Sequence, residues 1–348
     1  MQMQRGRKRL EATRTPNPSY RITRKEEIIL TRVFVTRKIP DLGIRVLREK
    51  GFEVEISDFD GVLPYEVLLQ KVRNTDAILS LLTDRMDAEL MDAAGPRLKV
   101  IGQFAVGFDN IDLEAARKRR IIVTNTPGVL TEATAELAVA LIYAIARRIV
   151  EGDRYVRNGD FCGWGPMLFL GNNLNGKILG IIGLGRIGKA VAQRLPQMKI
   201  IYYDSLRNKK FEEELGAEYR GLNEVLATAD FVSVHVPFNP QTQHLINAKR
   251  LMLMKRTAYL INTSRGPVID EIALVDALKS GLIKGAALDV YEKEPDMAPG
   301  LNKLDNVVLV PHIGSATEEA RSAMSELAAK NIIAVLSGEK PLTPILIP

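Results

Sequence analysis

Short apolar runs alternate with stretches of helical spacing from Arg32 onward. Over residues 32–127 the runs predict strands at Val33–Thr36, Val54–Ile56, Ala77–Leu81, Val100–Phe104 and Ile121–Thr124. The spacing between them predicts helices at Leu42–Lys50, Tyr65–Val72, Ala88–Ala94 and Leu113–Arg119, with Asp87 and Asp112 as N-caps and Gly51 as a stop signal. Strands and helices that alternate in this way predict a parallel sheet with helices on both faces.

A second series of the same kind begins at Lys177. Its apolar runs predict strands at Ile178–Ile182, Ile200–Tyr203, Phe231–Val236, Ala258–Asn262, Gly285–Val290 and Val307–Val310. Helices are predicted between them at Glu212–Leu215, Leu222–Ala227, Ala248–Met254 and Glu271–Lys279. Two longer helices, Thr131–Arg148 and Thr317–Leu336, flank this series. We therefore expect the chain to leave the first domain, build the second as an insertion, and return.

A glycine turn stands at the start of the second series. After the first apolar run come Gly183, Gly185 and Gly188 in the spacing G-x-G-x-x-G, then helical spacing over Lys189–Leu195 and a second strand that ends on Asp204. These glycines allow a tight turn, a close approach to a pyrophosphate and close packing of helix on strand. The helix N-terminus offers N–H groups to an anion, and an acid about 20 positions further on can bind a ribose diol. The pattern predicts a dinucleotide site rather than a merely structural turn.

The predicted fold class is therefore α/β, with two doubly wound parallel-sheet domains. A Rossmann NAD-binding domain over residues 128–315 is inserted into a flavodoxin-like substrate or lid domain made of residues 32–127 plus 316–348. A cleft between two such domains is a usual place for a ligand. One segment, residues 158–176, is rich in glycine and asparagine but also apolar, from Phe161 to Leu170. It is expected either to pack on its own domain or to wrap a partner subunit.

Composition excludes several function classes. Hydrophobic content of 46% and charged content of 26% are ordinary for a globular protein, and no apolar helix is long enough to span a bilayer. Residues 1–31 hold eight Lys or Arg and three acids, most of the net charge of +6, and are expected to form a poorly ordered extension. No aromatic interleaving supports nucleic-acid binding by this extension. The single cysteine, Cys162, fits a cytoplasmic location, and no ligand spacing predicts a metal site.

Proton transfer at neutral pH favours histidine, and the chain has three. His235 ends a strand and is expected to be a satisfied structural residue. His244 lies in a polar loop and is expected to be solvated. His312 follows a strand at its carboxyl end, which is the edge where ligands bind in open α/β sheets. We therefore favour His312 as the acid–base candidate.

Arg265 and two glutamates also follow strands. The guanidinium of Arg265 can hold a carboxylate with two parallel hydrogen bonds, and the alternative is a surface ion pair. Glu292 and Glu294 lie just after the strand Gly285–Val290. A carboxylate beside a histidine orients the ring, but spacing alone does not choose between the two glutamates.

Several segments together resemble the D-2-hydroxyacid dehydrogenase family over about residues 31–340. The segments are AVGFDNID (105–112), TPGVLTEATAEL (126–137), GLGRIG (183–188), HVP (235–237), INTSRG (261–266), ALDVYEKEP (287–295) and PHIGSAT (311–317). The likeness is greatest to glyoxylate and hydroxypyruvate reductases, whose arm is similar to WGPMLFLG (164–171). The resemblance implies NAD-dependent reduction of a small 2-oxo acid, glyoxylate or hydroxypyruvate first, to the D-2-hydroxy acid. It also implies a homodimer formed through the NAD domain.

The resemblance also assigns roles. Arg265 would bind the substrate, His312 would be the general acid in reduction, and Glu294 would pair with His312. Val106 and Gly107 would offer backbone N–H groups to the substrate carboxylate. Asp289 would hold the nicotinamide carboxamide. The remaining residues implied at the cofactor are Thr134, Gly183, Gly185, Arg186, Ile187, Gly188, Asp204, Pro237, Thr242, Thr263 and Gly314.

Three features qualify these expectations. Asp204 favours NAD because it would repel the 2′-phosphate of NADP, although Arg207 and Lys209 lie nearby and leave NADP as the alternative. Pro196 interrupts the helix after the glycine turn, which predicts a displaced Asp204 or a short helix. Gln103 stands where similar phosphoglycerate dehydrogenases carry arginine, which disfavours phosphorylated substrates. The alternatives are 3-phosphoglycerate oxidation and a dinucleotide-sensing protein like the corepressors that share this fold.

Overall fold

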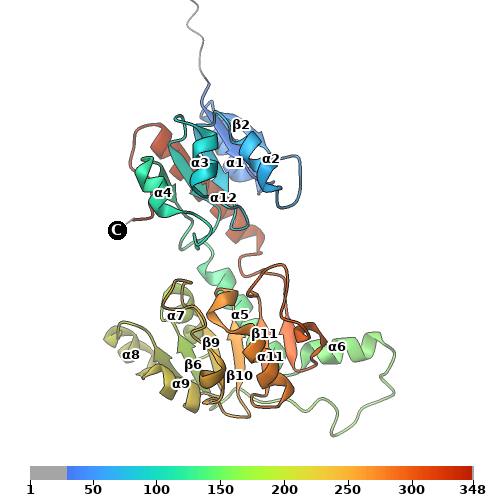
Figure 1. Cartoon of the computed structure of the whole chain (residues 1–348). Coiled ribbons are helices and arrows are strands. Elements are labelled where there is room, and N and C mark those ends of the chain that lie inside the picture. Colours follow the sequence, from blue (N-terminus) through green and yellow to red (C-terminus); the bar gives the residue numbers. More distant parts are fainter. Residues whose placement is uncertain (1–29, 347–348) are drawn as a thin grey trace, which may run out of the picture. The chain divides into compact units, whose positions relative to one another are not determined.

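The computed structural model describes residues 30–346 (Figure 1). The predicted basic extension lies outside the described residues except at Leu30 and Thr31. Thr31 already belongs to the folded part of the chain, because its carbonyl accepts a hydrogen bond of 2.9 Å from the Glu53 N–H.

Within the described residues, the first sheet has five parallel strands in the order β2-β1-β3-β4-β5. This is the flavodoxin-like order that the sequence predicts. The strands are β1 (Arg32–Val35), β2 (Glu53–Ile56), β3 (Ala77–Ser80), β4 (Val100–Gln103) and β5 (Ile122–Thr124). The helices are α1 (Asp41–Glu49), α2 (Tyr65–Lys71), α3 (Ala88–Ala94) and α4 (Leu113–Lys118). The N-caps predicted at Asp87 and Asp112 are confirmed, since each carboxylate accepts a backbone N–H of the first turn, at 3.0 Å and 2.9 Å.

The C-terminal helix α12 (Glu318–Leu336) returns to this first sheet, as the sequence predicts. Its buried face, including Met324, Ala328 and Ile332, joins the core that also holds Val33 and Val100. The packing against α1 is close: a side chain added at Gly43 would lie 2.2 Å from the Ser325 carbonyl oxygen. The first domain is thus completed by residues from the far end of the chain.

The second sheet has seven parallel strands in the order β12-β11-β10-β9-β6-β7-β8 within the described residues. They are β6 (Ile178–Ile182), β7 (Lys199–Tyr203), β8 (Glu218–Tyr219), β9 (Phe231–Val234), β10 (Tyr259–Asn262), β11 (Gly285–Leu288) and β12 (Val307–Leu309). The associated helices are α5 (Thr131–Ala146), α6 (Ile149–Arg157), α7 (Arg186–Gln193), α8 (Lys209–Leu215), α9 (Leu222–Thr228), α10 (Ala248–Leu251) and α11 (Glu271–Lys279), with short 3₁₀ turns at Gly266–Val268 and Leu301–Lys303. This is the Rossmann order, with β8 as its third strand and β12 as an additional strand at the opposite edge. The two-residue β8 was not predicted, because it has no apolar run.

The helix predicted over Thr131–Arg148 is confirmed as α5, and a second helix that the sequence did not predict, α6, follows it at once. Helix α5 ends at Ala146, Arg148 adopts the left-handed region with φ of 53°, and α6 follows. At the break, the N–H of Asn172 donates a 2.8 Å hydrogen bond to the Ala146 carbonyl, which therefore has a partner without a continued helix. Arg148 then pairs with Glu151 in the first turn of α6 at 2.5 Å.

Figure 1 shows α6 leading into a long segment without helix or strand. Of its apolar side chains, Trp164 is 85% exposed and Met167 is 76% exposed, and Phe161 and Leu170 are also exposed. Phe169 alone of these packs against ring and cation neighbours, at Tyr155 and Arg148. Most of this segment therefore does not pack on its own domain.

Candidate active site

The glycine turn joins β6 to α7 and has the shape that a dinucleotide requires. Gly183 has φ of 94°, and a side chain there would lie 2.7 Å from the backbone of His235. A side chain at Gly188 would lie 2.2 Å from the Gly183 carbonyl oxygen. Gly185, by contrast, has open space on its Cα. Backbone atoms therefore pack against Gly183 and Gly188, whereas the space next to Gly185, at the N-terminus of α7, is open. A pyrophosphate would be bound there.

Asp204 lies beside this turn, although α7 is short. Its carboxylate accepts a 2.6 Å hydrogen bond from the Leu184 N–H. Helix α7 ends at Gln193, before Pro196, so of the two consequences of the proline the structure shows the shorter helix. Arg207 points its guanidinium at Glu212 in a two-pronged ion pair with distances of 2.9 and 2.7 Å. Glu212 also accepts the Tyr202 hydroxyl at 2.7 Å.

Three neighbouring strands carry the predicted catalytic residues at their carboxyl ends. Arg265 follows β10, Glu294 follows β11 and His312 follows β12, and these strands are adjacent in the sheet. The structure brings Glu294 to His312, with 2.8 Å between Oε2 and Nδ1. Glu292, the alternative that spacing left open, pairs with His244 instead. The path of the loop after β11 thus gives different partners to two glutamates that lie only two positions apart in the sequence.

His312 is held from several sides. Its backbone is in the left-handed region, with φ of 53°, which is uncommon for a residue with a side chain. Asp289, which is buried, fixes the residues that follow, because its oxygens accept the N–H groups of Ile313 at 2.6 Å and Gly314 at 2.8 Å. Nε2 of His312 has no hydrogen-bond partner within residues 30–346. The ring therefore keeps one nitrogen for Glu294 and one for a ligand.

The pKa values of Glu294 and Asp289 depend on their burial and on neighbouring charged groups. Burial acts to raise the pKa of Glu294, but the hydrogen bond and charge of His312, the Tyr291 N–H and Arg265 together hold that pKa below its usual value. Glu294 is therefore ionised at neutral pH, and its pairing with His312 is lost only as the pH falls through this lowered pKa. Burial raises the pKa of Asp289, against the opposing effect of two backbone hydrogen bonds and His312.

Arg265 lies against the loop that holds Val106 and Gly107. A side chain added at Gly107 would lie 1.7 Å from Nη2 of Arg265, so only glycine permits this approach. Nε of Arg265 donates to Oδ1 of Asp109 at 3.1 Å, and Nη1 donates to the Ser264 carbonyl at 2.9 Å. The guanidinium and the Val106–Gly107 backbone thus form one cluster of donors, the arrangement that binds a carboxylate.

Other predicted cofactor residues surround the same sheet edge. Thr134, near the start of α5, lies next to Gly314: a side chain added at Gly314 would be 3.4 Å from the Thr134 methyl. The Thr263 hydroxyl is buried at the end of β10 without a hydrogen-bond partner among the described residues, so it is available to a ligand. Thr242 donates its hydroxyl to the Pro237 carbonyl at 2.7 Å. Arg186 and Ile187 begin α7 at the glycine turn. The residues present therefore fit a dinucleotide.

The other two histidines have structural surroundings. His235 contacts the Ser233 hydroxyl at 2.8 Å, and burial lowers its pKa to about 4, so the prediction of a satisfied strand-end residue is confirmed. The predicted solvation of His244 is borne out in part, but the sequence did not predict its partner. Although its side chain is 38% exposed, it pairs with Glu292 at 2.8 Å, a contact between residues too far apart in sequence for loop composition to reveal.

Sequence reasoning missed two residues at this site. Asp109, the partner of Arg265, lies inside the segment AVGFDNID, but nothing in its spacing connects it with a residue so far along the chain. Glu271 is a buried acid at the start of α11, and its carboxylate accepts the N–H groups of Glu292 at 2.6 Å and Ala298 at 2.5 Å. It thereby ties down both ends of the loop that carries Glu294. An acid in the first turn of a helix looks like ordinary capping in the sequence.

Gln103 is enclosed in the first domain and is fully buried on β4. Its amide contacts the Ser80 hydroxyl at 2.7 Å, the Asn110 side chain at 2.7 Å and the Gly107 carbonyl at 3.3 Å. In this chain Gln103 is therefore a support of the Gly107 loop.

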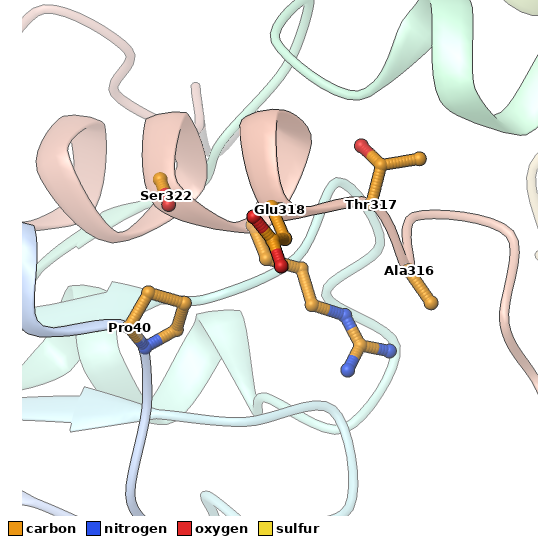
Figure 2. Close-up of a pocket in the computed structure, with 6 residues that line it drawn as sticks. Pro40, Ala316, Thr317, Glu318 and Ser322 are labelled. Atoms are coloured by element: carbon orange, nitrogen blue, oxygen red, sulfur yellow. The ribbon is translucent and has the colours of Figure 1, made fainter.

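A separate hollow of about 390 Å³ lies at the start of α12. Figure 2 shows its lining, which is Pro40, Ala316, Thr317, Glu318, Arg321 and Ser322. None of the predicted catalytic residues lines it. Over residues 30–346 we find neither a cluster of metal ligands nor a helix long and apolar enough to cross a membrane.

Comparison with known proteins places this geometry in a family. Residues 139–314 match the family model described as "D-isomer specific 2-hydroxyacid dehydrogenase, NAD binding domain". The glyoxylate reductase of Thermococcus litoralis is 55% identical over 316 residues, which cover 89% of this chain and 95% of that protein. The chain belongs to the D-isomer-specific 2-hydroxyacid dehydrogenases.

Solved structures with the same fold support this membership. A Thermus thermophilus protein is 46% identical, with a TM-score of 0.85 over 91% of this chain and 100% of its own. A Sinorhizobium meliloti NADPH-dependent glyoxylate/hydroxypyruvate reductase, solved with NADP and malonate, is 34% identical, with a TM-score of 0.81 over 90% of this chain and 96% of its own.

As a D-2-hydroxyacid dehydrogenase, the chain is an oxidoreductase that interconverts 2-oxo and 2-hydroxy acids with NAD or NADP. The predicted family and reaction class are thus confirmed, and so is the fold of two parallel-sheet domains. The comparisons favour neither phosphoglycerate oxidation nor a purely sensing role.

Proposed function

We propose that this D-2-hydroxyacid dehydrogenase reduces glyoxylate, and hydroxypyruvate after it, using NADH. The observation that carries the proposal is the meeting of Arg265, Glu294 and His312 at three adjacent strand ends beside the glycine turn. The high identity to proteins named glyoxylate reductase supports the choice of substrate. In this proposal residues 128–315 bind the cofactor, and residues 32–127 with 316–348 supply the substrate loop.

Each protein group has a distinct task in the proposed reaction. The N–H groups of Val106 and Gly107 and the Arg265 guanidinium bind the substrate carboxylate, and Arg265 also polarises the carbonyl oxygen. The protonated ring of His312 gives its Nε2 proton to that oxygen. Glu294 stabilises the charged ring and fixes its orientation through Nδ1. When bound, the reduced nicotinamide supplies a hydride to the carbonyl carbon.

The proposed cofactor contacts follow the turn and the sheet edge. Gly183, Gly185, Arg186, Ile187 and Gly188 would hold the pyrophosphate at the N-terminus of α7. Asp204 would accept hydrogen bonds from the ribose diol. The nicotinamide end would lie near Asp289, with Thr134, Pro237, Thr242, Thr263 and Gly314 around the cofactor.

We expect wild-type kcat/KM to be at least about tenfold higher with NADH than with NADPH, a difference of about 1.4 kcal/mol. Asp204 would repel a 2′-phosphate, and Arg207 is held by Glu212 in a two-pronged pair that opposes its use as a phosphate ligand. Steady-state rates with each cofactor measure the ratio. The Asp204→Asn variant should shrink it, since the repelling charge is gone while the shape is kept. Equal kcat/KM for the two cofactors in the wild type would contradict the assignment.

Substrate choice is tested by one panel of rates. Glyoxylate, hydroxypyruvate, pyruvate, 2-ketogluconate and 3-phosphohydroxypyruvate are each supplied with NADH and with NADPH. We expect glyoxylate and hydroxypyruvate to give the highest kcat/KM. A preference for the phosphorylated acid would replace this proposal with the phosphoglycerate alternative, and no turnover with any acid would refute a reductase.

A homodimer formed through the NAD domain is part of the proposal, as is a cytoplasmic location. The support for the dimer is the apolar segment after α6, whose Trp164 and Met167 are largely exposed in the single chain. Covering such side chains with a second subunit would remove them from water. Sizing that finds only a 38.6 kDa species would count against the dimer.

A further inference from the structure

The backbone N–H groups of Val106 and Gly107 have no acceptor in the part of the chain that the structure describes. Within residues 30–346 neither donates a hydrogen bond, although both residues are partly buried. The carbonyl oxygens of the same two peptide units are, in contrast, both engaged. The Ala105 oxygen accepts the Thr126 N–H at 2.9 Å, and the Val106 oxygen accepts Nδ2 of Asn125 at 2.7 Å.

This pattern determines where the N–H groups point. In a trans peptide the C=O and the N–H of one unit lie on opposite sides of the chain. Binding the Ala105 oxygen on the side of Thr126 therefore turns the Val106 N–H the other way. Binding the Val106 oxygen to Asn125 does the same for the Gly107 N–H. Both free donors are thus presented on the side away from residues 125–126.

Asn125 is itself fixed by the end of the chain. The hydroxyl of Thr343 donates to the Asn125 carbonyl at 2.6 Å, and the Asn125 N–H donates to the Thr343 carbonyl at 3.3 Å. Thr343 is held in turn by the fully buried Asn331 of α12, through contacts of 2.7 and 3.0 Å. One chain of hydrogen bonds runs from α12 through Thr343 and Asn125 to the Val106 carbonyl.

We propose that Asn125, held in place by Thr343, is a positioning residue that aims the Val106 and Gly107 N–H groups at the substrate carboxylate. The inference rests on the proposed function, in which this loop binds that carboxylate. Its physical basis is that the N–H end of a peptide unit attracts a carboxylate, whereas the C=O end repels it. If the 106–107 peptide unit rotates, a carbonyl oxygen replaces an N–H opposite the carboxylate, and an attraction becomes a repulsion.

The experiment compares variants that remove single polar groups without adding charge. Asn125→Leu removes the amide that holds the Val106 oxygen, and Thr343→Val removes the hydroxyl that holds Asn125. We expect the KM for glyoxylate to rise about tenfold in Asn125→Leu and about threefold in Thr343→Val, as the loss of one or part of one hydrogen bond predicts. The KM for NADH should not change. Thr343→Ser keeps the hydroxyl and should restore the KM for glyoxylate.

A control variant and a binding measurement complete the experiment. Thr228→Val removes an exposed hydroxyl that bonds only within α9 and serves as the matched control. Calorimetric titration of oxalate into the NADH-bound protein reports carboxylate binding without turnover, and its affinity should fall in the same order as the KM rises.

The inference and the proposed function fail in different ways. A wild type that reduces no 2-oxo acid refutes the function, and oxalate binding then decides the inference alone. Unchanged KM for glyoxylate and unchanged oxalate affinity in both Asn125→Leu and Thr343→Val would overturn the inference. So would a loss of kcat with both KM values unchanged, which would indicate damage to the fold only.

Discussion

The His312→Ala variant is expected to reduce glyoxylate with a kcat at least about 10² lower than that of the wild type, while NADH still binds. The reason is the position of the ring. Its Nδ1 is occupied by Glu294 at 2.8 Å, and its Nε2 is free within the described residues. The two residues that follow are fixed because their backbone N–H groups donate to Asp289. Removing the ring leaves the carbonyl oxygen without a positioned proton donor. Steady-state kinetics and NADH fluorescence measure the two effects separately.

His244→Ala is the matched control, because His244 forms a pair of the same 2.8 Å length with Glu292 and is not among the predicted catalytic residues. The two side chains are 38% and 26% exposed, and a partly exposed pair of this kind is worth at most about 1 kcal/mol, so kcat should stay within about fivefold of the wild type. Glu294→Gln should lie between the two variants, since the ring remains but loses its charged partner. Near-normal turnover by His312→Ala would remove His312 from the acid–base role.

Replacing Arg265 with alanine should lower kcat/KM for glyoxylate by about 10²–10³, because truncating one partner of a desolvated, hydrogen-bonded charge pair costs about 3–4 kcal/mol. Arg265→Lys keeps the charge but loses the planar fork, so its loss should be smaller yet clear. The affinity for NADH, measured by fluorescence, should change little in both. Steady-state kinetics with glyoxylate give the ratios.

Arg117→Ala provides the control for Arg265. Arg117 is an exposed arginine in a two-pronged pair with Glu114 on α4, with contacts of 2.9 and 2.8 Å. Its loss should leave kcat/KM for glyoxylate unchanged. If Arg265→Ala also leaves kcat/KM for glyoxylate unchanged, Arg265 forms only a surface ion pair, which is the alternative that the sequence left open.

The parts of the fold that local patterns determine could be predicted. The strand–glycine turn–helix–acid pattern is contiguous, so Gly183 and Asp204 could be related from the order of residues alone. Likewise, strand-end position made Arg265 and His312 candidates, because parallel strands bring their carboxyl ends to one edge. The choice between Glu292 and Glu294 needed the resemblance to a family, since it depends on the path of the loop after β11.

The features that escaped prediction depend on contacts between distant segments. Helix α6 was not predicted, and it follows α5 after a break at which the distant Asn172 N–H donates to the Ala146 carbonyl. His244 pairs with Glu292, and Asp109 pairs with Arg265, although the partners lie far apart in the sequence. The exposed segment around Trp164 is a related case, since its composition left open whether it packs on its own domain, and burial in the fold shows that most of it does not.

The most direct test of the central claim is the stoichiometry of the wild-type reaction with glyoxylate and NADH. NADH consumed is followed by absorbance, and glycolate formed is quantified in the same sample. We predict one glycolate for each NADH oxidised, with both signals reduced together in His312→Ala. Oxidation of NADH without matching glycolate, or no oxidation at all, would contradict a site built from Arg265, Glu294 and His312 to reduce a 2-oxo acid.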